Sequence, residues 1–210
     1  MTLSMAAIGS ALGFIFAMTL VYFRTWPSYW LIPLRYLIVA YVEVFRRIPF
    51  LVLAFLVFFA TKALGLNISL FFVACATVVL MATAFIAEII RAGFESIRPN
   101  QWESAEVLNF GRARTIFYVI WPQTLPIVVP SAFSYFVMFI KETSLTSQIG
   151  AFELMTAGKY FNNIGITPIL SFGTCLALYF LLSYPLTLLG HYVERRLKGR
   201  FNRPTGEEAG

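Results

Sequence analysis

Long apolar runs dominate the chain, and polar residues gather in the intervals between them. A helix needs about 20 apolar residues to cross a bilayer. The runs lack the short alternating segments of a membrane barrel, so helices are expected. The pattern predicts an all-α, polytopic membrane protein of about five transmembrane helices, folded as one transmembrane domain over residues 1–210. The predicted spans are 2–23, 50–63, 70–90, 126–148 and 167–189.

The stretches outside the spans receive separate predictions. Residues 24–49 connect two spans and have an apolar middle, which is either an interfacial helix or the start of a long tilted one. Residues 150–165 are predicted to be a loop, and the chain from Glu194 onward a basic tail. Within the first span, small residues favour the close approach of another helix. They are Gly9, Ser10, Ala11 and Gly13.

The longest polar interval, 88–123, contains the signals of a short helix. Pro99 ends the preceding helix, because its ring lacks an N–H and restricts the residue before it. Asn100 and Glu103 have the spacing of a capping box. These residues therefore predict a helix over 101–108.

The second half of this interval predicts a turn and another helix. Asn109 tolerates the left-handed conformation that ends many helices. Gly111 permits a sharp turn before a helical run over 112–121, which is predicted to break at Pro122. Further prolines at intervals of four predict kinks at the start of the fourth span. Helices this short are not stable alone, so the pair needs a partner surface.

The sequence from Glu103 to Pro122 resembles the EAA loop of ATP-binding-cassette (ABC) importer permeases. The family pattern is Glu-Ala-Ala, three residues, Gly, nine residues and then Ile-x-Leu-Pro, and its spacing fits here without a gap. Asn in place of Gly keeps the tolerance of a positive φ, so the turn of the motif is retained. The chain departs from the pattern at Ser104, Asn109, Val119 and Trp121.

Two further stretches resemble the polar-amino-acid branch of these permeases. Residues 41–51 are similar to a Tyr-Val-Glu-Leu-Phe-Arg-x-Thr-Pro-Leu-Leu pattern and differ from it at Val44, Ile48 and Phe50. Residues 141–145 are similar to Lys-Asp-Thr-Ser-Leu, with Glu142 in place of Asp. The resemblance covers most of residues 41–148.

The resemblance implies the membrane-spanning permease subunit of an importer that translocates a polar amino acid. Its implied partners are an ABC ATPase subunit dimer, a second permease chain (a second copy or a related chain), an extracytoplasmic solute-binding protein, the amino-acid substrate and membrane lipid. The loop over 91–123 is then cytoplasmic and docks on the ATPase. The implied ATPase-coupling residues are Gln101, Trp102, Glu103, Ser104, Ala105, Leu108, Asn109, Gly111 and Arg112.

The distribution of positive charge indicates the same orientation independently of the resemblance. With five spans and a cytoplasmic 91–123 loop, most of the 16 Lys and Arg residues lie on the cytoplasmic side, as the positive-inside rule requires. This predicts a multi-pass protein of the bacterial cytoplasmic (inner) membrane with a cytoplasmic C-terminus. The net charge of +6 does not indicate nucleic-acid binding, because the basic residues lie beside apolar runs rather than in one patch.

Polar residues near the end of the fourth span predict a solute path. A charge inside a span is costly and usually faces a partner or a water-filled cavity. Two adjacent residues of a helix point about 100° apart, so Lys141 and Glu142 pair poorly with each other. The alternative to a solute path is structural, with both charges paired to other helices. At helical spacing, one face carries Lys141, Ser144 and Gln148, and another carries Thr143 and Ser147.

The sequence has no motif for ATP hydrolysis or for metal-dependent or serine-dependent hydrolysis. A phosphate-binding Gly-rich loop with Lys and Ser or Thr, an HExxH and a GxSxG are all absent. ATP hydrolysis is therefore expected in a separate subunit, with no cofactor and no metal in this chain. Cys75 and Cys175 lie in apolar stretches and are expected in the core, and His191 is expected at the membrane interface.

Other functions stay open at this point. The chain could be a permease for another small polar solute, an energy-independent channel, or an intramembrane enzyme or scaffold that uses Lys141 and Glu142. An enzyme needs a nucleophile with a nearby base or a metal cluster, which the spans lack. A channel does not need a docking loop. Acidic, basic and amide amino acids share the same framework, so the sequence favours none of them.

Overall fold

The computed structural model describes residues 1–26 and 28–201, and over these residues the chain is helical without a β-strand. The predicted all-α fold is therefore confirmed. Three short segments, η1 (Tyr29–Leu31), the π-helical η2 (Thr115–Ile120) and the 3₁₀-helical η3 (Thr143–Ile149), connect longer helices. The α-helices are α1 (Thr2–Thr25), α2 (Ile32–Phe45), α3 (Phe50–Ala63), α4 (Leu70–Glu95), α5 (Pro99–Val107), α6 (Arg112–Arg114), α7 (Trp121–Glu142), α8 (Leu154–Asn163) and α9 (Pro168–Phe201).

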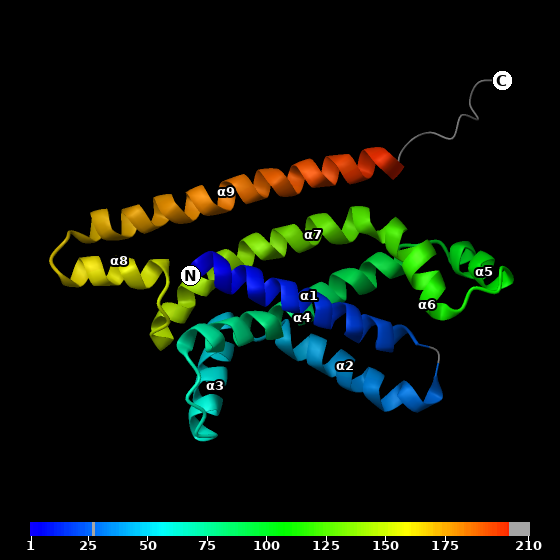
Figure 1. Cartoon of the computed structure of the whole chain (residues 1–210), viewed down its shortest axis with the longest axis horizontal. Helices are drawn as coiled ribbons and strands as arrows, with labels where there is room; N and C mark the ends of the chain where they lie inside the picture. Colours follow the sequence, from blue (N-terminus) through cyan, green and yellow to red (C-terminus); the bar gives the residue numbers. More distant parts are fainter. Residues whose placement is uncertain (27, 202–210) are drawn as a thin grey trace.

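The helices form an elongated bundle with two different ends (Figure 1). α5 and α6 lie at one end, together with the last turns of α9, and we call this the α5 end. The N-terminus and α8 lie at the other end, which we call the α8 end. Between them α4 packs against α1, α2, α3 and α7, so α4 is the centre of the bundle. α9 packs along α7 and α8.

The most extensive contact between two helices is that of α1 with α4, and two glycines make it possible. A Cβ atom on Gly9 would lie 2.5 Å from Cγ1 of Val78, and one on Gly13 would lie 2.6 Å from Cβ of Ala82. Without side chains at these positions the two backbones can approach closely, as small residues allow in membrane helices. The predicted close approach is confirmed for Gly9 and Gly13, whereas Ala11 is exposed.

The stretch between α1 and α4 forms a bent pair of helices. Residues 29–45 and 50–63 together are long and apolar enough to cross a membrane, with a bend of 115° between them. Pro49 has an extended conformation just before α3, at φ −62° and ψ 140°, and it disfavours helix in the residue before it. The helix predicted within 24–49 is confirmed as α2, and it directly precedes the predicted span 50–63.

α7 runs through its prolines, which corrects the predicted break at Pro122. The helical stretch Arg112–Ile149 is continuous enough to count as one candidate span. Pro122 lies in the first turn of α7, directly after the π-helical η2. Pro126 and Pro130 lie inside α7, and the π-helical η2 precedes it. The irregularity is therefore a π-helical segment before the prolines rather than a break at the first of them.

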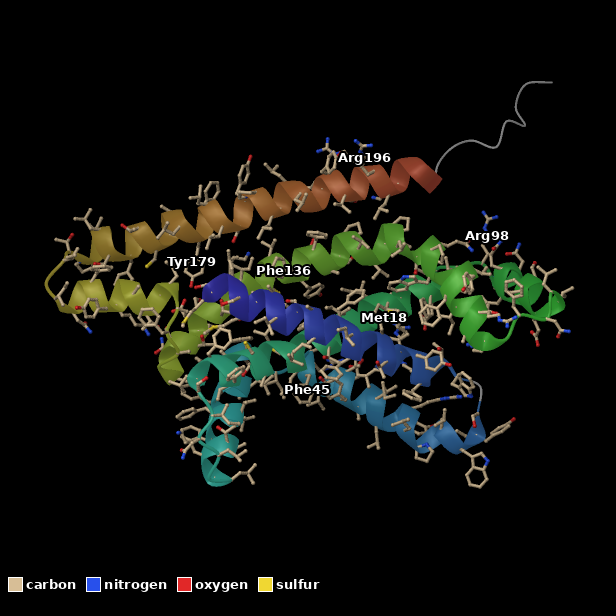
Figure 2. All side chains as sticks on the ribbon, in the orientation of Figure 1. Met18, Phe45, Arg98, Phe136, Tyr179 and Arg196 are labelled. Atoms are coloured by element: carbon tan, nitrogen blue, oxygen red, sulfur yellow. The ribbon has the colours of Figure 1, made fainter. Side chains whose placement is uncertain are left out.

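The predicted loop over 150–165 contains the helix α8, which is a further correction. Glu153 caps it, because the carboxylate accepts hydrogen bonds from the backbone N–H groups of Met155 and Thr156 at 2.8 and 2.7 Å. The same carboxylate accepts a hydrogen bond from the Tyr179 hydroxyl at 2.6 Å. Figure 2 shows Tyr179 pointing from α9 toward this region. Sequence reasoning missed α8 because Glu is not among the usual N-cap residues.

Candidate coupling surface and solute path

The predicted short helix of the polar interval exists, but it starts earlier than its predicted cap. α5 begins at Pro99, its N-cap residue is Arg98, and no side chain caps it. The capping box of Asn100 and Glu103 is therefore wrong, since both residues lie inside the helix. The fixed φ of Pro99 suits the first helical position, so this residue starts the new helix as well as limiting the previous one. Arg98 points away from the bundle (Figure 2).

The turn after α5 is made by Asn109 rather than by Gly111. Asn109 has a φ of 60°, which confirms the predicted left-handed conformation. Gly111 has φ −65° and ψ 153°, a conformation open to most residues, and a Cβ there would meet no atom within 4 Å. The special backbone predicted for Gly111 is therefore not required by this fold.

The inner face of α5 holds the helix to the bundle. The Gln123 amide Nε2 donates a hydrogen bond to Oε1 of Gln101 at 3.1 Å, which ties α5 to α7. The Trp102 ring packs edge-on against Phe94 of α4, with ring centroids 6.4 Å apart. Ala105 is buried on the same side. Three of the predicted coupling residues, Gln101, Trp102 and Ala105, therefore contact their own chain.

The outer face of α5 is exposed and partly apolar. Leu108 and Val107 are 68% and 86% exposed, although both are apolar. The polar residues Glu103 and Ser104 are exposed beside them. Sequence reasoning listed Leu108, Glu103 and Ser104 but missed Val107. Val107 could have been found from the sequence, because it is an apolar residue next to Leu108 in an otherwise polar interval.

Arg112 differs from the other predicted coupling residues, because its side chain turns back to the bundle. Its Nη2 donates a hydrogen bond to the carbonyl oxygen of Thr25 at 2.7 Å. Its guanidinium lies over the Trp102 ring, 4.6 Å from the centroid. We call residues 96–114 the coupling segment. This segment therefore contacts α1 through Arg112, α4 through Trp102 and α7 through Gln101.

The predicted solute path crosses a change of helix type. α7 ends at Glu142, and residues from Thr143 to Ile149 form the 3₁₀ helix η3. In a 3₁₀ helix, residues three apart share a face, and Thr143, Thr146 and Ile149 are accordingly all buried. The predicted α-helical faces beyond Glu142 are therefore wrong, because the period changes from 3.6 to 3 at this residue.

The side chains of the predicted path divide into a buried and an exposed group. The Ser147 hydroxyl is buried and accepts a hydrogen bond from Nζ of Lys159 at 3.0 Å, which connects η3 to α8. Lys141 and Gln148 are exposed, and Glu142 and Ser144 are half-buried. Among the residues that the structure describes, neither Lys141 nor Glu142 forms an ion pair. The structure brings these residues to the α8 end of α7.

Comparison with protein families identifies the chain. A sequence profile described as "Binding-protein-dependent transport system inner membrane component" matches residues 9–199. The chain belongs to this family. It is therefore a membrane permease subunit of a transport system, a role that is consistent with the absence of catalytic motifs noted in the sequence.

Relatives of this permease carry names from amino-acid transport. The probable glutamine ABC transporter permease protein GlnM of Bacillus subtilis is 30% identical over 166 residues, which are 79% of this chain and 77% of that protein. The L-cystine transport system permease protein TcyB of the same organism is 32% identical over 166 residues, 79% of this chain and 71% of that protein. The glutamine transport system permease protein GlnP of Escherichia coli is 28% identical over 94% of this chain and 90% of its own length.

Solved permease structures have the same fold. A crystal structure of an amino acid ABC transporter with histidines aligns with a TM-score of 0.84 and 26% identity, over 93% of this chain and 90% of that one. The MetNI methionine ABC transporter in an inward-facing conformation aligns with a TM-score of 0.79 and 22% identity, over 93% and 92% of the two chains. At that identity the second alignment shows the fold alone.

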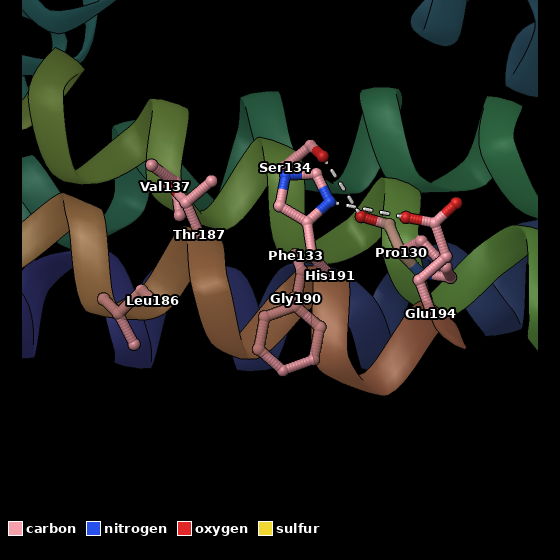
Figure 3. Close-up of a pocket in the computed structure, with 9 residues that line it drawn as sticks. All are labelled: Pro130, Phe133, Ser134, Val137, Leu186, Thr187, Gly190, His191 and Glu194. Atoms are coloured by element: carbon pink, nitrogen blue, oxygen red, sulfur yellow. Dashed lines mark hydrogen bonds and ion pairs between the residues drawn. The ribbon is translucent and has the colours of Figure 1, made fainter. Parts of the chain in front are cut away.

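A small cavity between α7 and α9 of the permease lies outside both predicted sites. It has a volume of about 190 Å³ and is lined by residues such as Pro130, Ser134 and His191. Figure 3 shows the Ser134 hydroxyl bonded to the Pro130 carbonyl and His191 paired with Glu194. Nδ1 of His191 lies 3.6 Å from the Glu194 carboxylate, and the His191 side chain is 61% exposed. These polar groups are therefore already paired with one another.

Proposed function

We propose that this permease is the membrane-spanning subunit of an ABC importer that takes up a polar amino acid. The observation that carries the proposal is α5, a short helix with the spacing of the EAA motif that is held at one end of an apolar bundle with an exposed outer face. Relatives named for glutamine and L-cystine transport support an amino acid as the solute. Apolar helices and the family support a place in the bacterial inner membrane.

The α5 end faces the cytoplasm in this proposal, and the C-terminus lies on the same side. Arg98, Arg112 and Arg114 belong to the coupling segment at this end, and positive residues favour the cytoplasmic side of a membrane protein. An ABC ATPase subunit dimer binds at this end and hydrolyses ATP. The extracytoplasmic solute-binding protein delivers the amino acid at the α8 end. A second permease chain, either a second copy or a related chain, completes the path.

Docking on the ATPase uses the outer face of α5. Val107 and Leu108 supply apolar surface, and covering such surface is favourable by about 25 cal/mol per Å². Glu103 and Ser104 supply polar groups beside it, the arrangement typical of a protein interface with an apolar centre and a polar rim. Asn109 fixes the end of the helix and so the direction in which Leu108 points.

The test of docking replaces Leu108 by Asp in the complete transporter. A carboxylate at the centre of an apolar contact loses its water without gaining a partner, so Leu108→Asp should abolish co-purification of the ATPase. The matched control is Ile164→Asp, which makes the same kind of change at an exposed apolar residue of the α8 end. The proposed function would be contradicted if the Leu108→Asp variant, at normal expression, still co-purified with the ATPase and still showed solute-stimulated ATP hydrolysis.

The solute path uses Lys141 and its neighbours at the end of α7 and in η3. An exposed lysine without an ion pair in the described chain is suited to the carboxylate of a zwitterionic amino acid, and Glu142 is suited to its ammonium group. Ser144 and Gln148 offer further hydrogen bonds, whereas Thr143 and Ser147 are buried and support η3. The family-level alternative is another small polar solute that makes the same kind of contacts.

The test of the path is Lys141→Met. This variant should assemble with the ATPase but lose solute stimulation of ATP hydrolysis, or change its order of preference among amino acids. Lys62→Met is the control, because Lys62 is also exposed but lies on α3, outside the predicted path. Failure to assemble, or transport with unchanged preference, would remove Lys141 from the solute path.

A further inference from the structure

Arg112 joins two helices that are far apart in the sequence. It follows the turn that ends α5, yet its Nη2 donates a hydrogen bond to the carbonyl of Thr25, 87 residues earlier, at 2.7 Å. Thr25 is the last residue of α1. The same guanidinium lies over the Trp102 ring of α5, 4.6 Å from the ring centroid. One side chain therefore touches both the coupling helix and the end of α1.

The chemistry of this contact makes it stronger than an ordinary tertiary hydrogen bond. The last four carbonyl groups of an α-helix have no partner within the helix, and the Thr25 carbonyl is one of them. The helix dipole also favours positive charge at this position. A guanidinium can donate in its plane while its face stacks on an aromatic ring. The Thr25–Arg112 bond is charge-assisted, so its loss weakens the connection between the two helices.

α1 is packed tightly against α4. The absence of side chains at Gly9 and Gly13 brings the two backbones together along much of their length, and Met5, Ala6 and Ala17 are completely buried. Close-packed helices transmit displacement rather than absorbing it. A pull on the end of α1 therefore acts on the α1–α4 pair, which is the centre of the bundle.

We propose that Arg112 is a positioning residue that latches α5 to the carboxyl end of α1, so that movement of α5 reaches the α1–α4 pair. The proposal rests on the proposed function, and it assigns Arg112 a contact inside the permease rather than on the ATPase. Arg114, two residues further on, is exposed and makes no side-chain hydrogen bond or ion pair within the described chain. It is therefore a matched control with the same charge in the same segment.

The experiment compares Arg112→Gln, Arg112→Lys and Arg114→Gln in the full transporter reconstituted in vesicles. Two quantities are measured: ATPase co-purification, and L-glutamine transported per ATP hydrolysed. All three variants should co-purify with the ATPase like the parent. Arg112→Gln should lower glutamine transported per ATP by about tenfold, the change expected when one charge-assisted hydrogen bond is lost. Arg112→Lys keeps the positive charge but lacks the planar guanidinium, so its glutamine transport per ATP should lie between that of Arg112→Gln and that of the parent. Arg114→Gln should match the parent.

Equal transport per ATP in Arg112→Gln and Arg114→Gln would overturn the latch. Loss of co-purification in Arg112→Gln would overturn it as well, because Arg112 would then belong to the docking face or to the stability of the fold. The variant Leu108→Asp keeps the two proposals separate. If Leu108→Asp still assembles and transports, the proposed function fails whatever the Arg112 variants do. If Leu108→Asp abolishes assembly while the Arg112 variants behave like the parent, the latch alone fails.

Discussion

The α1–α4 interface and the coupling segment, residues 96–114, use glycine in opposite ways. In the interface, Gly9 and Gly13 have no space for a side chain, because a Cβ would lie 2.5 and 2.6 Å from atoms of α4. In the coupling segment, Gly111 has open space around it and an ordinary extended backbone. The residue with the unusual backbone there is Asn109, at φ 60°. Glycine is thus a packing requirement in one region and dispensable to the backbone in the other.

This difference separates a rigid part of the permease from an adjustable one. In the interface, residue size determines whether the helices can meet at all. In the coupling segment, the backbone direction depends on Asn109, and the exposed side chains of Val107 and Leu108 form the apolar part of the outer surface. A segment with an exposed outer face is free to follow a partner that binds it, whereas the α1–α4 pair is close-packed and resists deformation.

The largest effect is expected from Gly9→Leu. The new Cβ would overlap Val78, and over-packing of this kind costs about 1–3 kcal/mol or more, because neither backbone can withdraw without separating the helices. Most of the protein should then be lost from the monodisperse fraction after detergent extraction, measured by size-exclusion chromatography. Gly173→Leu is the control, since no atom lies within 4 Å of a Cβ there. Equal yields of the two variants would show that α1 and α4 are not closely packed.

A smaller effect is expected from Asn109→Val. A left-handed conformation costs an L-residue about 1–2 kcal/mol, and more for a β-branched side chain. The turn after α5 should therefore shift, and the affinity for the ATPase should fall by roughly tenfold. Titration of the purified permease with ATPase measures this affinity. Asn109→Gly should bind normally, because glycine adopts the same φ without strain. Weak binding by the glycine variant would mean that the Asn side chain itself contacts the ATPase.

Signals that act over a few residues allowed a correct prediction from the sequence. The apolar runs predicted a helical membrane protein, and the small residues of the first span predicted a close helix contact. The left-handed Asn109 also followed from its position after a short helix. The family resemblance rested on a spacing that is independent of three-dimensional contacts. Each of these features depends on local backbone preference or on overall hydrophobicity.

Three of the failed predictions concern features that depend on partners far away in the chain. The inward direction of Arg112 is set by the Thr25 carbonyl, which no local pattern reveals. The change from α7 to the 3₁₀ helix η3 after Glu142 accompanies burial of Thr143 and Thr146 against other elements. The cap of α8 needs Glu153 to be buried beside Tyr179 of α9. Tertiary packing overrides local preference at all three places.

The smallest effect is expected from Gly111→Val, although the sequence alone predicted a sharp turn at Gly111. Valine readily adopts φ −65° and ψ 153°, and its side chain would project into open space. Replacing glycine at a compatible backbone position also restricts the unfolded chain, which favours the folded state by about 0.4–1 kcal/mol. Gly111→Val should therefore match the parent in thermal unfolding and in transport, measured beside Asn109→Val. A loss of transport with normal stability would instead place the Gly111 backbone in direct contact with the ATPase, where a side chain leaves no room.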